Sequence, residues 1–569
     1  MTISSVRWLF ALGVGVALSA CGDDGGSAGD VGTTDDPTTG PGMMGTSTGD
    51  VDPEGTTTDE PPPGVEWEFE PVFGVPNIDD DDENGTNDWL QVIFEGEDDH
   101  STLLIPALPA GHTVSATLSG NLEQTRVWND GSFVLGSGDG VVQETYDFTP
   151  GAEGTTLDIE FGIDYAVAQL TLAHLDDTGA EVESAPVLMM SSPAILNHHM
   201  QPTEHVWVVE VQAGFGSNVD MVADYEAVLG DQFTAIAGAS YGFDVWIQDE
   251  VQLAYGIGAE GQRADTVIDS IRDRPLDPWA EDALEGPGTN IRVWGDPAQA
   301  TSWDSFGNLE NSPPLTNGGV EYPFGRSYYG KQGNLGIHDD MSDFLVAQDI
   351  QAPVELDTFW LCVGHVDEFS SFVPDPDSPK GYRFVISDVP SAYALLETLD
   401  PTMSLGRYGP DHGFATVGDI LDDTALRNLN DALQEDELDP IRETMIAEFG
   451  LEESDILYMP SLFETIGGCG GGTAALVPGM INLIVANLEN GESHLFIPDP
   501  FFRGNADGQE ADPMIQAFSD NLPATLIPHY VDDWDVYHLG LGEVHCGTNM
   551  TRTPTDNWWE VGLHLLSGM

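Results

Sequence analysis

The pattern of apolar and polar residues divides most of the chain into two regions of different character. Between about residues 65 and 195, apolar residues alternate with polar ones in short runs, and turn residues recur between the runs: WLQVIFEG, HTVSATLSG, TLDIEFGI and VAQLTLAHL. A period of two is typical of strands that bury one face. Many short strands with frequent turns predict an antiparallel β-sandwich over residues 65–195.

The pattern changes at about residue 196. From there, apolar β-branched runs (HVWVVEVQ, YRFVISDV, INLIVANL) alternate with stretches of helical period, ADTVIDSIRD and DDTALRNLNDALQEDELDPIRETMIAEFG. This alternation predicts an α/β region over residues 196–569. Periodicity alone is compatible with a doubly wound sheet, a barrel or a propeller of repeated α/β units. No GxGxxG or GxxxxGK[ST] motif follows a predicted strand, so nucleotide binding has no support.

The N-terminal sequence MTISSVRWLFALGVGVALSACGDDGG predicts export. Arg7 precedes an apolar run that is too short for a mature membrane span, so residues 1–20 fit a secretory signal. LSAC resembles the lipobox of bacterial lipoproteins, which predicts lipidation of Cys21 and anchoring to the bacterial cell envelope. An ordinary secretion signal with an incidental Cys21, giving an extracellular protein, is the alternative. Residues 21–64, rich in Gly, Thr, Asp and Pro, predict a disordered tether.

The charge balance narrows the range of partners. The chain has 98 acidic and 15 basic residues, a formal net charge of -83. Such a field repels nucleic acid and anionic membranes, so we expect no nucleic-acid partner and no membrane contact except through the lipid. The acid excess fits either a surface suited to salty surroundings or carboxylate sites for calcium. Either way, the field attracts cationic, arginine-bearing substrates.

Three cysteines remain after Cys21, namely Cys362, Cys469 and Cys546. Disulfides form in exported proteins, and an odd number leaves at least one thiol unpaired within the chain.

An acidic cluster lies near the start of the predicted sandwich, in PNIDDDDENGTNDW. Asp80, Asp82, Asn84 and Gly85 stand at the first, third, fifth and sixth positions of a calcium loop, but Gln91 stands where an EF-hand has a bidentate acid. The cluster is therefore not an EF-hand. We favour a calcium site of another topology, with a solvated acidic turn as the alternative.

Three distant segments combine titratable groups with aromatic or glycine neighbours: DVWIQDEVQLAY, CVGHVDEFSSFVPDPD and LGEVHCGTNMTRTP. They contain Asp249, His365, Asp367 and Cys546. A cysteine nucleophile reacts as its thiolate and commonly has a remote histidine as partner. Two carboxylates that face one pocket raise each other's pKa unless a cation lies between them. A planar guanidinium fits that description.

Five motifs carry a family resemblance: WIQDE, DSFGNLENSPP, YPFGR, VGHVDEFSSFVP and GEVHCGTN. In this order and spacing they resemble the catalytic domain of the peptidylarginine deiminases, from about residue 195 to the end. The resemblance implies an α+β multidomain fold, in which an immunoglobulin-like β-sandwich precedes a pseudo-fivefold α/β propeller with the site at its centre. It also implies hydrolysis of peptidyl-arginine to peptidyl-citrulline and ammonia.

The resemblance assigns a role to each motif residue. Asp249 and Asp367 would clamp the guanidinium, Cys546 would attack its carbon to give a thiouronium intermediate, and His365 would act as acid and then base. The residues expected to bind the rest of the substrate are Trp246, Val363, Arg274 and its neighbour Arg272. His545, adjacent to Cys546, has a structural role in this interpretation, because neighbours in an extended segment point opposite ways. We expect Gly547 to let the substrate approach the sulfur.

Calcium is the cofactor that the resemblance implies, with arginine-containing proteins or peptides as partners. One site would use Gln248, the carbonyls of Phe306 and Leu309, and Glu310; a second would use Glu250, Asp269, Ser270 and Asp273. The first site departs from the family, because Gln252 stands where a glutamate is expected, and that loss would weaken calcium binding. Gly540 and Leu541 also replace an arginine and a histidine that are familiar in animal members.

Two further hypotheses remain. One is a deiminase of free arginine or agmatine, and the other is an inactive calcium-binding surface protein. The sequence carries no signal for an oligomeric state.

Overall fold

The computed structural model describes residues 67–78, 80, 86–94, 99–138, 140–333, 335–505 and 508–566. The predicted signal, Cys21, the tether, and Asp82 and Asn84 of the predicted calcium loop lie outside these ranges. The segment Trp67–Met569 forms one compact unit. Across the described part, none of the helices is both long enough and apolar enough to span a membrane.

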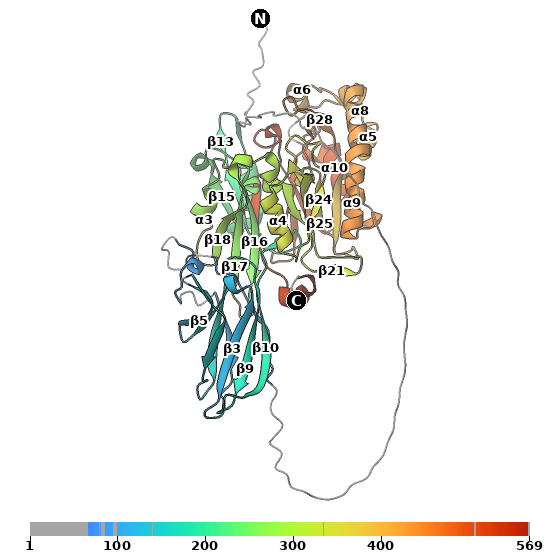
Figure 1. Ribbon diagram of the computed structural model, residues 1–569. Coiled ribbons are helices and arrows are strands. Elements are labelled where there is room, and N and C mark those ends of the chain that lie inside the picture. Colours follow the sequence, from blue (N-terminus) through green and yellow to red (C-terminus); the bar gives the residue numbers. More distant parts are fainter. Residues whose placement is uncertain are drawn as a thin grey trace, which may run out of the picture. The chain divides into compact units, whose positions relative to one another are not determined.

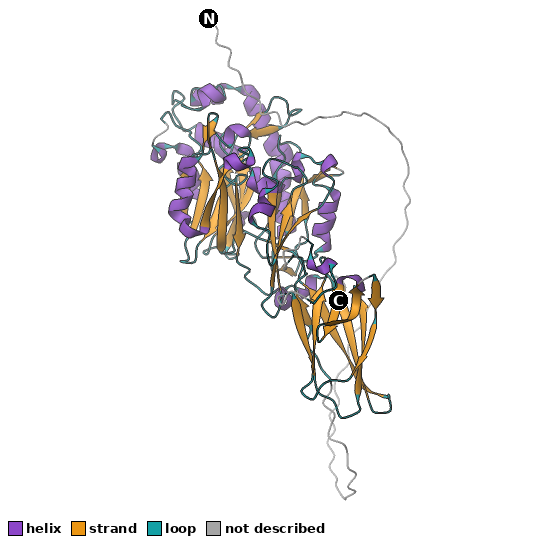
Figure 2. Cartoon of the chain, turned by 90° about the vertical axis from the view of Figure 1, so that its left-hand side faces the viewer, coloured by secondary structure: helices purple, strands orange, loops and turns teal. Residues whose placement is uncertain are grey.

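Two five-stranded sheets make up the first part of the described chain, and Figures 1 and 2 show their strands. Apolar residues of both sheets form one shared core, among them Leu118, Leu135, Ile159 and Leu170. The predicted sandwich layers are therefore present, and most strand pairs are antiparallel. One sheet has the order β1 (Val72–Gly74), β10 (Glu181–Ser191), β9 (Val167–Leu175), β3 (Thr113–Gly120), β7 (Thr145–Phe148); the other has β2 (His100–Ile105), β8 (Thr155–Phe161), β4 (Thr125–Asn129), β5 (Ser132–Gly138), β6 (Val141–Gln143).

The run WLQVIFEG does not form the predicted strand. Asp88–Leu90 is a 3₁₀ turn instead, and the side chain of Asn87 accepts a hydrogen bond from the N–H of Trp89. The guanidinium of Arg126 lies 3.8 Å above the Trp89 ring and donates to the Trp89 carbonyl at 2.6 Å. These contacts hold the segment as a turn against β4.

Five sheets of the described residues after residue 194 share one arrangement. In each, a central strand pairs antiparallel with one neighbour and parallel with the other. The antiparallel, central and parallel strands are β16 (Val251–Ile257), β17 (Arg263–Asp269) and β18 (Thr289–Val293); β19 (Leu309–Asn311), β22 (Ser327–Gln332) and β24 (Val354–Leu356); β25 (Ser370–Pro374), β26 (Tyr382–Asp388) and β27 (Ile456–Pro460); β30 (Ile484–Asn487), β31 (Ser493–Pro498) and β32 (Leu526–Val531); β33 (Thr548–Arg552), β12 (Thr203–Glu210) and β15 (Phe233–Ala237).

The last of these sheets joins the two ends of the region. β33, near the C-terminus, pairs with β12, near the start, with Val208 opposite Thr548. Shorter strands extend some sheets or pair separately: β11 (Ile195–Leu196), β23 (Leu335–Gly336), β13 (Gln212–Ala213) with β14 (Gly216–Ser217), β20 (Leu315–Asn317) with β21 (Val320–Tyr322), and β28 (Phe463–Thr465) with β29 (Thr473–Ala475).

Helices connect many of these strands, so the mixed α+β class is confirmed. The long helical stretch predicted near residue 422 forms α8 and α9, which Figure 1 shows in orange. The prediction of a helix at ADTVIDSIRD is wrong: residues 263–269 are β17, where Thr266, Val267 and Ile268 pair on both sides within a sheet. The helices are α1 (Val219–Leu229), α2 (Ile247–Glu250), α3 (Trp279–Ala283), α4 (Asp339–Ala347), α5 (Val389–Leu396), α6 (Tyr408–Asp411), α7 (Val417–Asp422), α8 (Thr424–Leu433), α9 (Asp439–Phe449), α10 (Pro513–Asn521) and α11 (Trp558–Val561).

Candidate active site

The four residues predicted to carry chemistry meet in space, and each lies just before the antiparallel strand of one of the five sheets. Asp249 is in α2 before β16, His365 and Asp367 lie at one turn before β25, and Cys546 precedes β33. The Cys546 Sγ atom is 3.3 Å from Asp367 Oδ2, and His365 Nδ1 is 3.5 Å from Asp249 Oδ1. All four residues are buried.

Three polar atoms of this group lack a hydrogen-bond partner among the described residues: Asp249 Oδ1, His365 Nδ1 and Asp367 Oδ1. Atoms of these three residues also surround Gly307, which precedes β19. A Cβ atom on Gly307 would lie 2.7 Å from His365 Nδ1 and 3.0 Å from both Asp249 Oδ1 and Asp367 Oδ2. Buried polar atoms are normally paired, so this convergence is suited to a cationic ligand with several N–H donors.

Burial raises the pKa of the Cys546 thiol well above its usual range, and the carboxylates of Asp367 and Asp249 raise it further. The thiol is therefore protonated at neutral pH when nothing neutralises these carboxylates. A cation placed between the two carboxylates cancels their effect on the pKa of the thiol, and so favours the reactive thiolate.

His365 is fixed by backbone contacts. Its Nε2 atom lies 2.8 Å from the carbonyl oxygen of Ser302, so Nε2–H donates and the Nδ1 lone pair faces Asp249. Glu368 accepts hydrogen bonds from the N–H groups of Gly364 and His365 at 3.0 and 2.8 Å. These bonds leave His365 Nδ1 directed toward the convergence of carboxylates.

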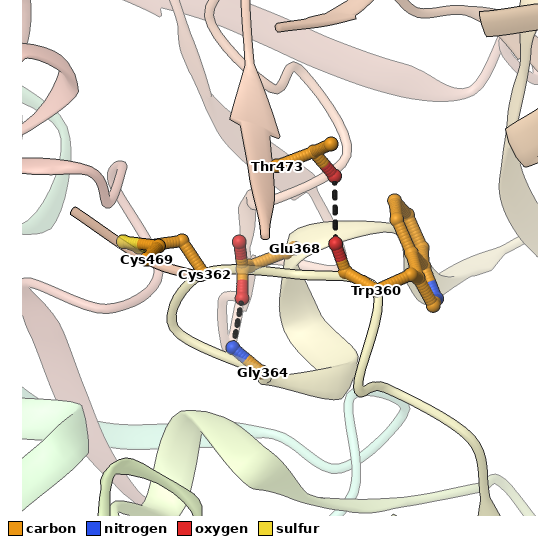
Figure 3. The surroundings of a disulfide bond; sticks show 6 residues. All are labelled: Trp360, Cys362, Gly364, Glu368, Cys469 and Thr473. Atoms are coloured by element: carbon orange, nitrogen blue, oxygen red, sulfur yellow. Dashed lines mark hydrogen bonds between the residues drawn. A yellow bond between two sulfur atoms is a disulfide. The ribbon is translucent and has the colours of Figure 1, made fainter. Parts of the chain in front are cut away.

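A disulfide between Cys362 and Cys469 anchors the segment that leads to His365 (Figure 3). Next to it, the Thr473 hydroxyl donates to the Trp360 carbonyl at 3.0 Å, and Cys362 N–H donates to the Thr473 carbonyl at 2.7 Å. Cys546 is a free, buried thiol, as the odd number of cysteines allows.

Asn482 belongs to the site, and sequence reasoning missed it. Its Nδ2 atom donates to Cys546 Sγ at 3.3 Å and to the Asp367 carbonyl at 3.2 Å. Its Oδ1 atom accepts from the N–H groups of His545 and Cys546. Asn482 comes just before the apolar run of β30, the same place relative to its sheet as Asp249, Asp367 and Cys546 have. That position is the signal that could have identified it.

The side chains predicted to bind the rest of the substrate border the group. Trp246 packs edge-on against Tyr537, with ring centroids 5.6 Å apart, and Val363 is half-buried next to Gly364. Arg272 donates to the hydroxyl of Ser305.

Arg274 makes contacts that the sequence did not predict. Its guanidinium lies 3.4 Å from Asp249 Oδ2, 3.1 Å from Glu250 Oε2 and 3.5 Å from Asp244 Oδ2, and it donates to the Trp246 carbonyl at 2.8 Å. Arg274 thus holds one oxygen of Asp249 and leaves the other facing His365.

The reason for a glycine at 547 differs from our expectation. A Cβ atom there would lie 2.1 Å from Cε1 of Tyr537. Gly547 is needed because Tyr537 packs against its backbone, and substrate access to the sulfur is not required to explain it.

One acidic group beside Asp249 fits calcium. The carboxylates of Glu250, Asp269 and Asp277 have oxygens within 4.8 Å of one another. Glu250 Oε1 and Asp269 Oδ1 are buried without a hydrogen-bond partner among the described residues. Burial, followed by neighbouring carboxylates, raises the pKa of Asp269 to about 8. Carboxylates that repel one another in this way are stabilised by a hard cation such as Ca²⁺, which binds oxygen ligands.

Asp277 was missed by sequence reasoning, whereas Ser270 and Asp273 were expected as ligands. Ser270 is adjacent to Asp269, but its hydroxyl donates to the Asp304 carbonyl at 2.9 Å. Asp273 is exposed, has a φ of 33°, and lies outside the group of three, although its charge raises the pKa of Asp277 after burial.

The other expected calcium set does not fit calcium. Glu310 is its single carboxylate, and Phe306 O accepts hydrogen bonds from Gln248 Nε2 and from Leu309 N–H. The Gln248 amide also donates to Gln252 at 2.9 Å. Calcium takes six to eight oxygen ligands. A histidine nitrogen also faces the single carboxylate, since His545 Nε2 lies 3.3 Å from Glu310 Oε1.

His545 also contacts Asp367. Its Nδ1 atom lies 2.9 Å from Asp367 Oδ2, the oxygen that Cys546 Sγ contacts. Burial lowers the pKa of His545, but Glu310 and Asp367 outweigh burial and raise it. For Glu310, burial raises the pKa to about 7.

Comparison with known proteins agrees with this geometry. The family model described as protein-arginine deiminase (PAD) matches residues 181–560. The chain is 34% identical over 416 residues to protein-arginine deiminase type-4 of Rattus norvegicus, covering 69% of this chain and 60% of that protein. It is 33% identical over 417 residues to type-3 of Homo sapiens, covering 68% and 59%.

The chain thus spans about 60% of the length of these relatives. The matched segment contains the loops of Asp249, Gly307, His365, Asp367, Asn482 and Cys546. The chain belongs to the protein-arginine deiminase family.

Proposed function

We propose that the protein hydrolyses the guanidinium of arginine within peptides, giving citrulline and ammonia. The observation that carries this proposal is the convergence of Asp249 Oδ1, Asp367 Oδ2 and His365 Nδ1 around Gly307, with Cys546 Sγ 3.3 Å from the same Asp367 oxygen. Two carboxylates on either side of a planar guanidinium satisfy its N–H groups in pairs. The reacting carbon is then held next to the sulfur.

The chemistry follows from these contacts. Guanidinium binding neutralises the carboxylates that raise the pKa of Cys546, and the thiol proton passes to the lone pair of His365 Nδ1. The thiolate forms a bond to the guanidinium carbon, and the C–N bond to one terminal nitrogen breaks. His365 Nδ1 supplies a proton to that nitrogen, which departs as ammonia. Asn482 Nδ2, 3.3 Å from Sγ, donates to the thiolate.

The second half returns the enzyme to its starting state. Water enters after ammonia has left, and His365 Nδ1, now without its proton, accepts one from that water. The oxygen adds to the thiouronium carbon, the C–S bond breaks, and citrulline leaves with Cys546 as the thiol.

Peptide specificity is proposed from the border of the site. Trp246 would pack on the aliphatic part of the substrate arginine, with Val363 beside it. The guanidinium of Arg274 is engaged by Asp249, Glu250 and Asp244, so contact between Arg274 and a substrate carbonyl requires it to leave at least one of them.

Calcium is proposed at Glu250, Asp269 and Asp277. A dication there would neutralise carboxylates next to Asp249 in α2 and compete with Arg274 for Glu250. Its proposed effect is to order Asp249; no step of the reaction passes through it.

For the fold, we propose that the five sheets form a closed pseudo-fivefold propeller. In this propeller, each sheet supplies to the centre the loop before its antiparallel strand, through Asp249, Gly307, Asp367, Asn482 and Cys546, and the pairing of β33 with β12 supports closure. We propose an immunoglobulin-like topology for the preceding sandwich. Export by residues 1–20 and lipidation at Cys21 stay proposals from sequence.

The test compares a blocked arginyl peptide with free arginine and agmatine, with calcium or a chelator, and measures citrulline. We expect the peptide to react best, and calcium to accelerate the reaction. Preference for free arginine or agmatine would reject the peptide substrate. No citrulline from any substrate, with reductant and millimolar-range calcium present, would favour the inactive binding protein.

A further inference from the structure

A cavity of about 40 Å³ lies beside His545, the sequence neighbour of Cys546, and its lining includes His199, Glu310, Gln248, Asn197 and Arg552. Ligand atoms of His199, Glu310 and His545 lie within 4.8 Å of one another, and the three side chains are 12%, 10% and 8% exposed. A volume of this size accommodates an ion with a water or two.

Both imidazoles present the same nitrogen to Glu310. His199 Nδ1 lies 3.0 Å from the Phe372 carbonyl oxygen, and His545 Nδ1 lies 2.9 Å from Asp367 Oδ2, so each Nδ1–H donates to an oxygen. The Nε2 lone pairs then face Glu310, at 3.9 Å from Oε2 and 3.3 Å from Oε1. A metal-binding histidine is commonly oriented in this way, through a hydrogen bond from its other nitrogen.

Two oxygen atoms on the cavity lining lack partners. Glu310 Oε1 and Asn197 Oδ1 are buried and accept no hydrogen bond from the described residues. Arg552 is the cation on the same lining, but its terminal nitrogens donate to the carbonyls of Gln201 and Val485 at 2.9 and 2.7 Å. The guanidinium of Arg552 therefore leaves the Glu310 oxygen without a hydrogen bond.

We propose that His199, Glu310 and His545 bind a divalent transition-metal ion such as Zn²⁺. Two imidazole nitrogens and one carboxylate form a donor set that Zn²⁺ prefers and calcium does not. Donors at about 2.0–2.1 Å from a tetrahedral ion lie about 3.4 Å apart, close to the separation of His545 Nε2 from Glu310 Oε1. The ion takes the place where the family resemblance implied calcium.

The test titrates the metal-free full chain with Zn²⁺ by calorimetry and with Co²⁺ by visible absorption. We expect one tight Zn²⁺ per chain from this site and the absorption bands of four-coordinate Co²⁺. His199→Gln and Glu310→Gln should weaken binding by about 100-fold or more, since even outer-shell changes cost up to that much.

Three matched variants separate this site from others. Binding should persist in Cys546→Ser, which removes the thiol, in Asp269→Asn, which alters the acidic group, and in His205→Gln, which removes a remote histidine that contacts Thr234. Unchanged binding in both ligand variants, or loss of binding in Cys546→Ser, would overturn the proposal. Absence of the absorption bands of four-coordinate Co²⁺ in the wild-type chain would also overturn the proposal. This result does not depend on whether the variants fold.

Discussion

Gly307 lies where the smallest side chain is needed. The atoms that its Cβ would approach are one histidine nitrogen and two carboxylate oxygens, which come from α2 and from the turn before β25. A methyl group there would displace these side chains or occupy the position of the guanidinium. A substitution of Gly307 therefore tests the geometry of the site and leaves every titratable side chain of the site in place.

We predict that Gly307→Ala lowers kcat/KM for an arginyl peptide by at least about 100-fold, because a displacement of about 1 Å at a reacting centre has this effect. Unfolding by urea should show only a modest loss of stability. Gly214→Ala is the control, since a Cβ on Gly214 meets nothing within 4 Å. Full activity of Gly307→Ala would show that the guanidinium does not bind beside Gly307.

Single residues differ in how far the sequence predicts them. Asp249, His365, Asp367 and Cys546 stand in motifs with aromatic or glycine neighbours, and the structure brings them together. Asn482 and Gly307 stand in short stretches where an amide or glycine is common, so only their common position before a strand distinguishes them. Asp277 follows a turn that brings it back to Glu250 and Asp269, a contact that depends on tertiary structure.

At the scale of elements, the segment leading to His365 is fixed by a covalent bond. Cys362 and Cys469 are 107 residues apart in sequence, and Cys469 lies in a run of glycines. A cross-link over a loop of that length restricts the unfolded chain and the segment itself. The segment also carries Gly364, which accommodates the Trp303 ring.

Replacing both Cys362 and Cys469 by Ser should lower the free energy of unfolding by about 4.7 kcal/mol, the value expected for a loop of about 100 residues. Urea unfolding of the double variant, compared with the wild type, measures the change. Cys546→Ser serves as the control for loss of a thiol without loss of a cross-link. Equal unfolding midpoints of double variant and wild type would contradict the prediction.

A second prediction concerns the pairing of β31 with β32. His494 Nδ1 and His529 Nε2 are 2.9 Å apart, and Glu492 is 3.5 Å from His494 Nε2. Burial, followed by the charge of His494, lowers the pKa of His529 below its ordinary value of 6.5. A pKa lowered by folding contributes stability above pH 6.5, and that stability is lost as the pH falls through the folded-state value.

We therefore expect thermal stability to fall between pH 7.5 and pH 5.5 by more in the wild type than in His529→Gln, which keeps a polar side chain that does not titrate. Melting curves at both pH values give this difference, and the many carboxylates contribute equally to both proteins. The same fall in both proteins would show that the histidine pair does not respond to pH.

Prediction from sequence was strongest for regular strands and long helices. HTVSATLSG, TLDIEFGI and VAQLTLAHL match β3, β8 and β9, because their alternation reflects burial on one face. ADTVIDSIRD failed because apolar residues at helical spacing also occur in β17, a central strand with partners on both sides. The five sheets share one order of antiparallel and parallel pairing, and the spacing of apolar residues along the sequence does not predict that order.

At the scale of the whole molecule, the charge of -83 dominates. So many carboxylates repel one another in the folded chain, and salt screens the repulsion with a Debye length of about 10 Å at 0.1 M. The same field attracts cationic substrates. Stability and substrate capture should therefore respond to salt in opposite directions.

We predict that raising NaCl from about 0.02 M to 0.5 M increases the melting temperature and lowers kcat/KM for an arginyl peptide flanked by lysines. The same arginine flanked by glutamates is the control, and its kcat/KM should not fall. If both peptides respond alike, the protein's charge does not steer its substrate.

The central claim is that Cys546 acts as a nucleophile on a peptidyl guanidinium held by Asp249 and Asp367. The most direct measurement is mass spectrometry of a blocked arginyl peptide incubated with wild type, Cys546→Ser, Asp249→Asn and Asp367→Asn, each shown to be folded. The account predicts conversion to the citrulline mass by the wild type, and rates at least about 1,000-fold lower in Cys546→Ser. Conversion by folded Cys546→Ser at the wild-type rate would contradict it.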